Sequence, residues 1–324
     1  MVKKILLSLL VLIVLAVAGL AVFVATFKPA QRPASTSKIE VTPELVARGD
    51  YLTHHVLGCF DCHTDRDWSR YGGPVDGPEG AGGPCMGEEY GVPGKVCFTN
   101  ITPDKETGLG NWTDGEILRA IREGVDKNGR ALFPMMPYAE AYYALSDDDA
   151  DAVVAYLRSL PPVSNPVPAT RIDFPVSFFI KQAPKPLAGP VSAADPSDTV
   201  AYGHYLATVA GCISCHTPVD SHQQPIPGME LAGGQVLKGP WGVVASANLT
   251  PDPTGLGGRT EESFLGLFRA WQDPGIQVAT PAGQNTVMPW LVHSGTSDQD
   301  LQAIWAYLQT VKPIQHKVVK RPAV

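Results

Sequence analysis

The chain has 324 residues with 25 Lys and Arg against 32 Asp and Glu, a length that favours two domains. The formal net charge of −7 excludes nucleic acid as the main partner, because phosphate binding needs a basic face. The 32 glycines and 30 prolines predict long loops between short helices, and the hydrophobic content of 44% excludes a disordered chain.

An apolar run opens the chain. Residues 5–27 contain no charge, and only Ser8, Gly19 and Thr26 interrupt their apolar character. As a helix this run is about 34 Å long, enough to cross a hydrocarbon core of roughly 30 Å. We predict an uncleaved transmembrane anchor over residues 1–28, and a cleaved secretory signal ending near Ala18 is the alternative. Both interpretations export the rest of the chain, in which residues 29–38 are predicted to form a flexible stalk.

The exported part contains an internal sequence repeat with two copies. Matched segments keep their order in the two copies: RGDYL and YGHYL, CFDCH and CISCH, NITPD and NLTPD, TGLG and TGLG, MPY and MPW, AYL and AYL. The repeat predicts two domains, residues 39–160 and 200–324. The linker between them, residues 161–199, carries nine prolines and several large apolar side chains. It is predicted to be stiff and to pack along the domains.

Helix start signals recur at matched places in the two copies. Thr113 begins a capping-box pattern, and its counterpart begins near Thr260. Ser146 and Ser297 each precede a run of acidic residues, which is typical of a helix N-terminus. The acidic cluster 147–151 is therefore interpreted as a helix start in preference to a metal site. No strand alternation stands out, so both domains are predicted to be mainly helical.

The two Cys-x-x-Cys-His segments carry the chemistry. This pattern is the attachment motif of c-type haem, in which two thiols add across the vinyl groups and the histidine binds the iron. A structural zinc site needs four ligands grouped locally, and a thioredoxin-like pair does not require the histidine, so both alternatives fit two copies less well. The sequence therefore predicts two covalently bound haem c groups. The residues that attach the haems are Cys59 and Cys62, and Cys212 and Cys215, with His63 and His216 as iron ligands.

A methionine is the predicted sixth ligand in each domain. Met136 and Met288 follow the motif histidines at nearly equal spacing, and both precede Pro and an aromatic residue. Met or His completes the coordination of such a haem, and the equal spacing favours a ligand over a core methionine. Met135 is the rival in the first domain. The remaining histidines are interpreted as surface or packing residues: His54, His55, His204, His222, His293 and His316.

Two cysteines remain outside the motifs. Cys85 and Cys97 lie in a loop of the first domain that has no counterpart in the second. In an oxidising compartment this even pair is predicted to form a disulfide that closes the loop, and a pair of free thiols is the alternative.

Charge also separates the two domains. Residues 39–160 hold 21 acidic and 10 basic residues, whereas residues 200–324 hold 8 and 7. An acidic first domain is suited to steering a basic partner, and equally to keeping the domain soluble.

Several of these segments resemble a known family. RGDYL…CFDCHT, NITPDKETGLGNWTDGEILRAIREGV, ALFPMMPY and AVVAYLRSLPPV resemble the membrane-bound multihaem cytochrome c subunits of bacterial alcohol, gluconate and aldehyde dehydrogenase complexes. The resemblance covers most of residues 45–162 and 200–311. It implies tandem class I cytochrome c domains, whose first and last helices cross near Gly49 and near Gly203. Such subunits usually carry three haem sites, whereas this chain has two.

Ligand saturation limits the predicted function. A haem bound by His and Met has no open position, which leaves one-electron exchange. We predict a membrane-tethered dihaem electron carrier without catalytic residues, on the periplasmic side of the bacterial inner membrane. Its predicted partners are a dehydrogenase subunit as donor and a cytochrome, oxidase or quinone as acceptor. The alternatives are a dihaem enzyme, such as a peroxidase or a thiosulfate-oxidising cytochrome, and a docking subunit with incidental haems.

Overall fold

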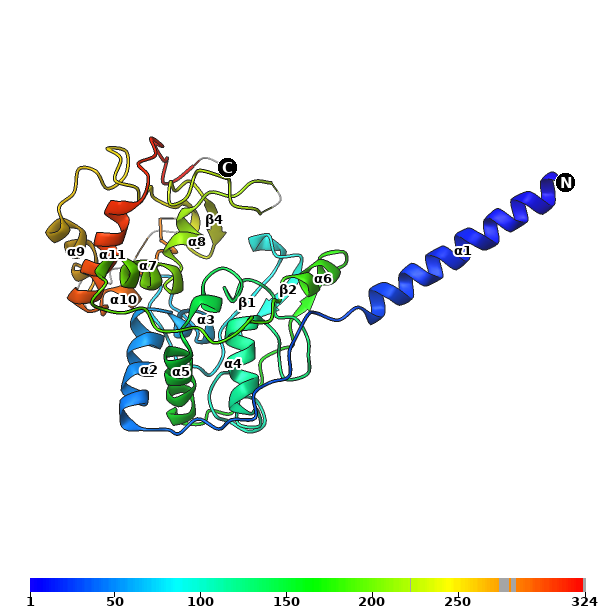
Figure 1. Ribbon diagram of the computed structural model, residues 1–324, viewed down its shortest axis with the longest axis horizontal. Coiled ribbons are helices and arrows are strands. Elements are labelled where there is room, and N and C mark those ends of the chain that lie inside the picture. Colours follow the sequence, from blue (N-terminus) through cyan, green and yellow to red (C-terminus); the bar gives the residue numbers. More distant parts are fainter. Residues whose placement is uncertain (222, 274–279, 281–283, 323–324) are drawn as a thin grey trace.

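The computed structural model describes residues 1–221, 223–273, 280 and 284–322, with one helix extending away from the rest (Figure 1). This helix, α1 (Val2–Thr26), has a mean hydropathy of 3.1 over its most apolar window, and none of that window is buried. By length and composition α1 can cross a membrane, and a signal sequence would have the same properties.

The two repeats are mainly helical, as the sequence predicts. The helices of the first repeat are α2 (Pro43–His55), α3 (Cys59–His63), α4 (Asp114–Glu123) and α5 (Asp147–Ser159), with the short 3-10 helices η1 (Glu88–Tyr90) and η2 (Tyr142–Ala144). The helices of the second repeat are α7 (Thr199–Val209), α8 (Cys212–His216), α9 (Glu261–Arg269), α10 (Trp290–His293) and α11 (Asp298–Thr310).

The predicted helix starts are confirmed. Thr113 and Thr260 both form capping boxes, at the starts of α4 and α9. Ser146 and Ser297 accept hydrogen bonds from the third residue of α5 and α11. The first turn of α5 holds part of the acidic cluster, and Asp147 pairs with Arg122 of α4. Within the described ranges no group of three or more Asp, Glu, Cys or His side chains is arranged to hold a metal ion.

The first and last helices of each repeat cross at a glycine. A Cβ atom on Gly49 of α2 would overlap the carbonyl oxygen of Ala152 in α5. A Cβ atom on Gly203 of α7 would overlap the carbonyl oxygen of Ala303 in α11. Only a glycine allows two helix backbones to approach so closely. The crossings that the family resemblance implied are therefore confirmed.

Short strands lie in the loops, where none was expected. β1 (Cys85–Met86), β2 (Gly94–Cys97) and β3 (Arg171–Ile172) form an antiparallel sheet, and β4 (Val236–Gly239) pairs with β5 (Gly242–Ala245). Each has at most four residues, too few for an alternating pattern to be recognised in a sequence.

The linker packs along the first repeat, as predicted. Its β3 strand pairs with β2, and it continues into α6 (Val176–Phe179) and η3 (Ile180–Gln182). Further along, the N–H of Asp147 donates to the carbonyl oxygen of Val191 at 2.9 Å. The linker is thus bound to the first repeat at both of these places.

The segment expected to be a flexible stalk instead lies along α4. Arg32 Nε is 2.6 Å from Glu123 Oε1, and immediately after the segment the N–H of Ile39 donates to Asp114 Oδ2 at 3.0 Å. The backbone of Ser35 passes so close to Gly115 that a Cβ atom there would overlap it. These contacts explain the difference, because both acidic residues belong to α4 and could not be matched to the stalk from sequence alone.

The repeats pack against each other through matched contacts. The hydroxyl of Tyr51 in α2 donates to Asp300 Oδ2 in α11 at 2.5 Å. The equivalent hydroxyl, of Tyr205 in α7, donates to Asp149 Oδ2 in α5 at 2.6 Å. Buried apolar residues of both repeats form one hydrophobic cluster. The arrangement resembles the two-fold interface of a dimer whose subunits have become one chain.

Candidate haem-binding sites

Both Cys-x-x-Cys-His motifs form a short helix that follows a left-handed glycine. Gly58 precedes α3 with φ of +65°, and Gly211 precedes α8 with φ of +74°. Other residues rarely adopt this conformation, which turns the chain sharply out of α2 and α7. One helical turn then places the two cysteines, three residues apart, on the same face.

The motif histidines are oriented by the backbone. His63 Nδ1 lies 2.7 Å from the carbonyl oxygen of Thr99, and His216 Nδ1 lies 2.7 Å from that of Ala247. Because a carbonyl accepts hydrogen bonds, Nδ1 carries the proton and the lone pair of Nε2 is available to a metal. Burial lowers the pKa of both imidazoles, which favours the neutral form that binds iron.

A matched asparagine fixes the backbone beside each of these carbonyls. Asn100 Oδ1 accepts the N–H and the hydroxyl of Thr102 at 2.9 and 2.7 Å, and its Nδ2 donates to the carbonyl oxygen of Val163 at 2.7 Å. Asn248 makes the same bonds to Thr250 at 2.9 and 2.8 Å. From the sequence, the NITPD and NLTPD segments served only to mark the repeat. Their recurrence in both copies was the signal that could have identified Asn100 and Asn248 as part of the site.

The two methionines face the same core as the cysteines. Met136 and Met288 pack against the hydrophobic cluster that also contacts Cys59 and Cys212. The residue two positions after each methionine donates its N–H back to the methionine carbonyl at 2.8 Å. Met135 packs instead in a separate cluster beneath the disulfide loop. The structure therefore separates the two candidates of the first repeat.

A side chain of the second repeat ties the Met288 loop to the first repeat. Asn285, which is 2% exposed, donates from Nδ2 to the carbonyl oxygens of Trp68 and Arg70 at 2.9 and 2.8 Å. Its Oδ1 accepts the N–H of Gly72 at 2.8 Å. The loop that carries Met288 is thus fastened to a loop of the other repeat, a contact with no signal in the sequence.

An aromatic stack strengthens the same junction. The ring of Tyr71 stacks on that of Trp271 at a centroid distance of 4.9 Å. Trp271 stacks in turn on Trp290, the second residue after Met288, at 6.0 Å. The first repeat therefore contacts the methionine loop of the second through both polar and aromatic groups.

The environment of the motif thiols disfavours other chemistry. Burial raises the pKa of the Cys59 and Cys212 thiols to about 12, and that of Cys62 to about 11. Thiol exchange uses the thiolate, which such a setting suppresses. None of the four motif cysteines takes part in a disulfide bond, so all four side chains can form thioether bonds.

Tyr142 lies between the two attachment motifs. Its hydroxyl donates to the carbonyl oxygen of Leu57 at 2.9 Å. Burial raises its pKa well above the usual value, and the thiols of Cys59, Cys62 and Cys215 add to the effect. Since these thiols belong to both repeats, the two motifs approach each other across this side chain.

The other histidines pack against protein groups. His54 lies 4.7 Å from the ring of Phe60, and His316 Nδ1 lies 2.9 Å from a carbonyl oxygen. His293 is buried where the repeats meet, and burial lowers its pKa to about 4. His222 lies outside the described residues.

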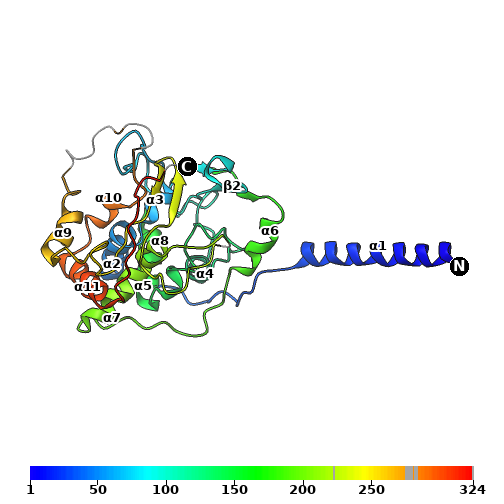
Figure 2. The same ribbon diagram turned by 90° about the horizontal axis from the view of Figure 1, so that it is seen from above.

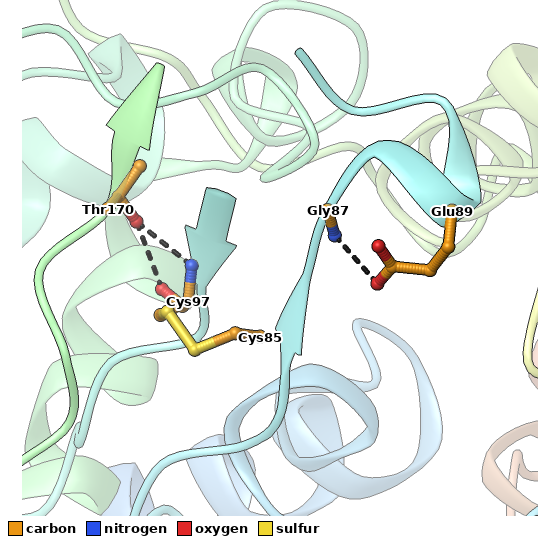
Figure 3. The surroundings of a disulfide bond; sticks show 5 residues. All are labelled: Cys85, Gly87, Glu89, Cys97 and Thr170. Carbon is orange, nitrogen blue, oxygen red and sulfur yellow. Dashed lines mark hydrogen bonds between the residues drawn. A yellow bond between two sulfur atoms is a disulfide. The ribbon is translucent and has the colours of Figure 1, made fainter. Parts of the chain in front are cut away.

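Cys85 and Cys97 form a disulfide bond, with an S–S distance of 1.98 Å (Figure 3). It joins β1 to β2. Thr170 of the linker bonds to Cys97 through both the N–H, at 3.0 Å, and the carbonyl oxygen, at 3.3 Å. The disulfide loop therefore also holds the linker strand.

Comparison with known proteins identifies the family of the chain and several of its relatives. The profile of the family "Cytochrome c" matches residues 48–161 and 200–312. The chain is 31% identical over 287 residues to the alcohol dehydrogenase (quinone) cytochrome c subunit of Gluconacetobacter polyoxogenes, covering 83% of this chain and 56% of that one. It is 29% identical to the fructose dehydrogenase cytochrome subunit of Gluconobacter japonicus, covering 82% and 52%.

A third relative matches over nearly its whole length. The chain is 28% identical to the diheme cytochrome c-type protein of Cereibacter sphaeroides, over 86% of this chain and 93% of that one. By contrast, the chain spans about half the length of the two dehydrogenase subunits.

Proposed function

Because the chain belongs to the cytochrome c family and carries its attachment motif twice, it has two covalent haem c groups, and we propose that it is a membrane-tethered electron carrier. Haem c supplies one-electron exchange when bound. The matched histidine geometry of the two repeats is the observation that carries the proposal. It leaves Nε2 free in both motifs, as an iron ligand requires.

We assign each haem its own set of residues. Cys59 and Cys62 attach the first haem and Cys212 and Cys215 the second, through thioether bonds. The axial ligands of the two irons are His63 with Met136, and His216 with Met288. The haem domains are residues 39–160 and 200–324. The packing of both methionines against the core that the motif cysteines contact supports this assignment.

Two occupied axial positions define the activity. An iron held between an imidazole and a thioether has no position for a substrate, so only electrons enter and leave. The chain is therefore a carrier and not a catalytic subunit. The names of the relatives support a dehydrogenase as electron donor, and a cytochrome, oxidase or quinone is the acceptor.

The tether is α1. Its apolar surface is exposed along the helix, which suits a bilayer, and residues 1–28 form the anchor. Haem attachment and the Cys85–Cys97 disulfide suit an oxidising compartment, which supports a position of the two repeats on the periplasmic side of the inner membrane.

An optical spectrum of the purified full chain tests this function. We expect two haems per chain, both low-spin, with the weak far-red band of methionine ligation and no change on adding cyanide or CO. A high-spin haem that reacts with peroxide would replace the carrier with a dihaem enzyme.

A further inference from the structure

The linker presents an aromatic surface at the end of α1. We call residues 174–181 the aromatic segment. The ring centroid of Phe178 lies 5.4 Å from that of Phe27 and 6.1 Å from that of Phe23. Lys181 Nζ donates to the carbonyl oxygen of Val24 at 3.2 Å. Both ribbon views show α6 beside the end of α1 that leads into the repeats (Figures 1 and 2).

The contact with α1 determines the position of the aromatic segment along the membrane normal. A helix of 25 residues is about 37 Å long, somewhat more than a hydrocarbon core of roughly 30 Å. If α1 spans the membrane, its last turn lies where hydrocarbon meets headgroups. The aromatic segment touches that turn, so it lies at the same height, where aromatic side chains are favoured.

The aromatic segment exposes side chains that are favoured in the interfacial layer of a membrane. Phe174 and Phe179 are 72% and 59% exposed. Outside α1, they are the exposed phenylalanines of the described ranges. Lys181 and the exposed Lys185 follow on the same stretch, and lysine can reach phosphate headgroups while its alkyl chain stays in the apolar layer. An exposed apolar patch beside a membrane helix is continuous with the surface that α1 offers to lipid.

The segment is fastened to the first repeat. Strand β3 immediately before it pairs with β2, and the N–H of Asp173 donates to the carbonyl oxygen of Pro93 at 3.1 Å. The Cys85–Cys97 disulfide holds β2 to β1, and Thr170 bonds to Cys97 (Figure 3). Fixing the aromatic segment in a membrane would therefore fix the orientation of the first repeat.

We propose that the aromatic segment inserts into the interfacial layer of the membrane that α1 spans, and seats the first repeat against a lipid surface. The inference rests on the proposed tether. The occupant is lipid: the phenylalanines enter the layer beneath the headgroups, and the lysines contact phosphate. The second repeat is then held at a distance set by its packing on the first.

Photolabelling by lipid tests the inference. The full haem-loaded chain is placed in nanodiscs of phosphatidylethanolamine and phosphatidylglycerol that contain a lipid with a diazirine on its acyl chain. After irradiation, labelled peptides are mapped by mass spectrometry. We expect label on α1 and on the aromatic segment. The matched control is the exposed Val236 and Val319 of the second repeat, which we expect to stay unlabelled.

The outcomes separate the inference from the tether. Label on α1 without label on the aromatic segment overturns the inference and leaves the tether standing; the patch is then free for a protein partner. Label on neither overturns both. In the F174S/F179S variant we expect at least a fivefold loss of label on the segment with α1 labelling unchanged, and an undiminished label there would contradict the role of the phenylalanines. Both positions are exposed, and unchanged haem absorbance verifies folding.

Discussion

The two repeats share the parts that orient a haem and differ in the parts around it. Both have a left-handed glycine before the motif helix, a histidine bonded to a carbonyl, and an asparagine that fixes the neighbouring backbone. The methionine loops differ. The N–H of each methionine bonds within its own repeat, that of Met136 to Phe133 and that of Met288 to Thr286, but the Met288 loop is also bound to the first repeat through Asn285.

This difference indicates a hierarchy. The disulfide, the three-stranded sheet and the contact with α1 all belong to the first repeat and the linker that packs on it. The second repeat has none of these among its described residues, and its methionine loop is held by contacts with the first repeat. We therefore expect the first repeat to hold its haem independently, and the second to depend on the first.

Removing the axial methionines gives the largest expected effect. In Met136→Ala or Met288→Ala the iron loses a thioether that stabilises Fe(II), so the potential of that haem should fall by on the order of 100 mV, within the ~0.8 V range that axial ligands span. Half of the far-red band should vanish in each variant. A potentiometric titration followed by absorbance measures both.

Met135→Ala is the matched control, because Met135 lies next to Met136 and packs with Met86 beneath the disulfide loop. It should leave both potentials unchanged. A shift in this variant, with none in Met136→Ala, would mean that the ligand of the first repeat is Met135.

Loss of the disulfide is the next largest effect. Its cysteines are 12 residues apart, and closing a loop of this length stabilises the folded state by about 3 kcal/mol. C85S/C97S should lower the free energy of unfolding of the first repeat by that amount, measured by urea unfolding followed by circular dichroism. Treating the unmodified chain with a phosphine reductant should have the same effect, since haem thioethers resist it. An unchanged midpoint would assign the disulfide no role in stability.

The features that could be predicted from the sequence are those encoded by short patterns that occur in both repeats. The capping boxes at Thr113 and Thr260 and the two motifs are short patterns whose meaning does not depend on distant residues, whereas the glycine crossings came from the family resemblance. The strands, the path of residues 29–38 along α4 and the Asn285 contact depend on which segments meet in space. A single asparagine carries no mark of a partner more than 200 residues away.

Asn285→Ala tests whether the methionine loop of the second repeat depends on its contact with the first repeat. The substitution removes the contact between repeats and leaves the buried N–H of Gly72 and the carbonyl of Trp68 unpaired, at a cost of about 2 kcal/mol, whereas the carbonyl of Arg70 still accepts the N–H of Gly73. We expect the far-red band of the second haem to disappear at a lower temperature than in the unmodified chain, while that of the first haem persists. Asn111→Ala, which removes an exposed loop asparagine of the first repeat, is the control and should change neither. If both bands melt as before, the second site does not depend on the first through this residue.

The smallest effect comes from the matched tyrosines of the interface, and it should be unequal. Tyr51→Phe and Tyr205→Phe each remove a hydrogen bond to a carboxylate, together with the hydroxyl that accepts a serine N–H in both places. Asp149 keeps Arg48, which donates two hydrogen bonds to it at 2.8 and 2.9 Å, so we expect Tyr205→Phe to lower the free energy of unfolding by only about 0.5 kcal/mol. Within the described chain, Tyr51 is the only side chain that donates a hydrogen bond to the carboxylate of Asp300, which is 6% exposed, so Tyr51→Phe should cost about 1.5 kcal/mol.

Urea unfolding of the two variants and of the double variant measures this inequality. Arg48 links the two contacts, because its guanidinium lies 5.6 Å from the ring centroid of Tyr51 and also bonds Asp149, so the double variant measures the coupling between them. Equal costs for Tyr51→Phe and Tyr205→Phe would mean that Arg48 does not compensate at Asp149, and the interface would then be as symmetric in energy as it is in geometry. An unequal result would show that the two matched contacts differ in energy, because the Arg48 side chain pairs with Asp149 within the first repeat and Asp300 has no such partner among the described side chains.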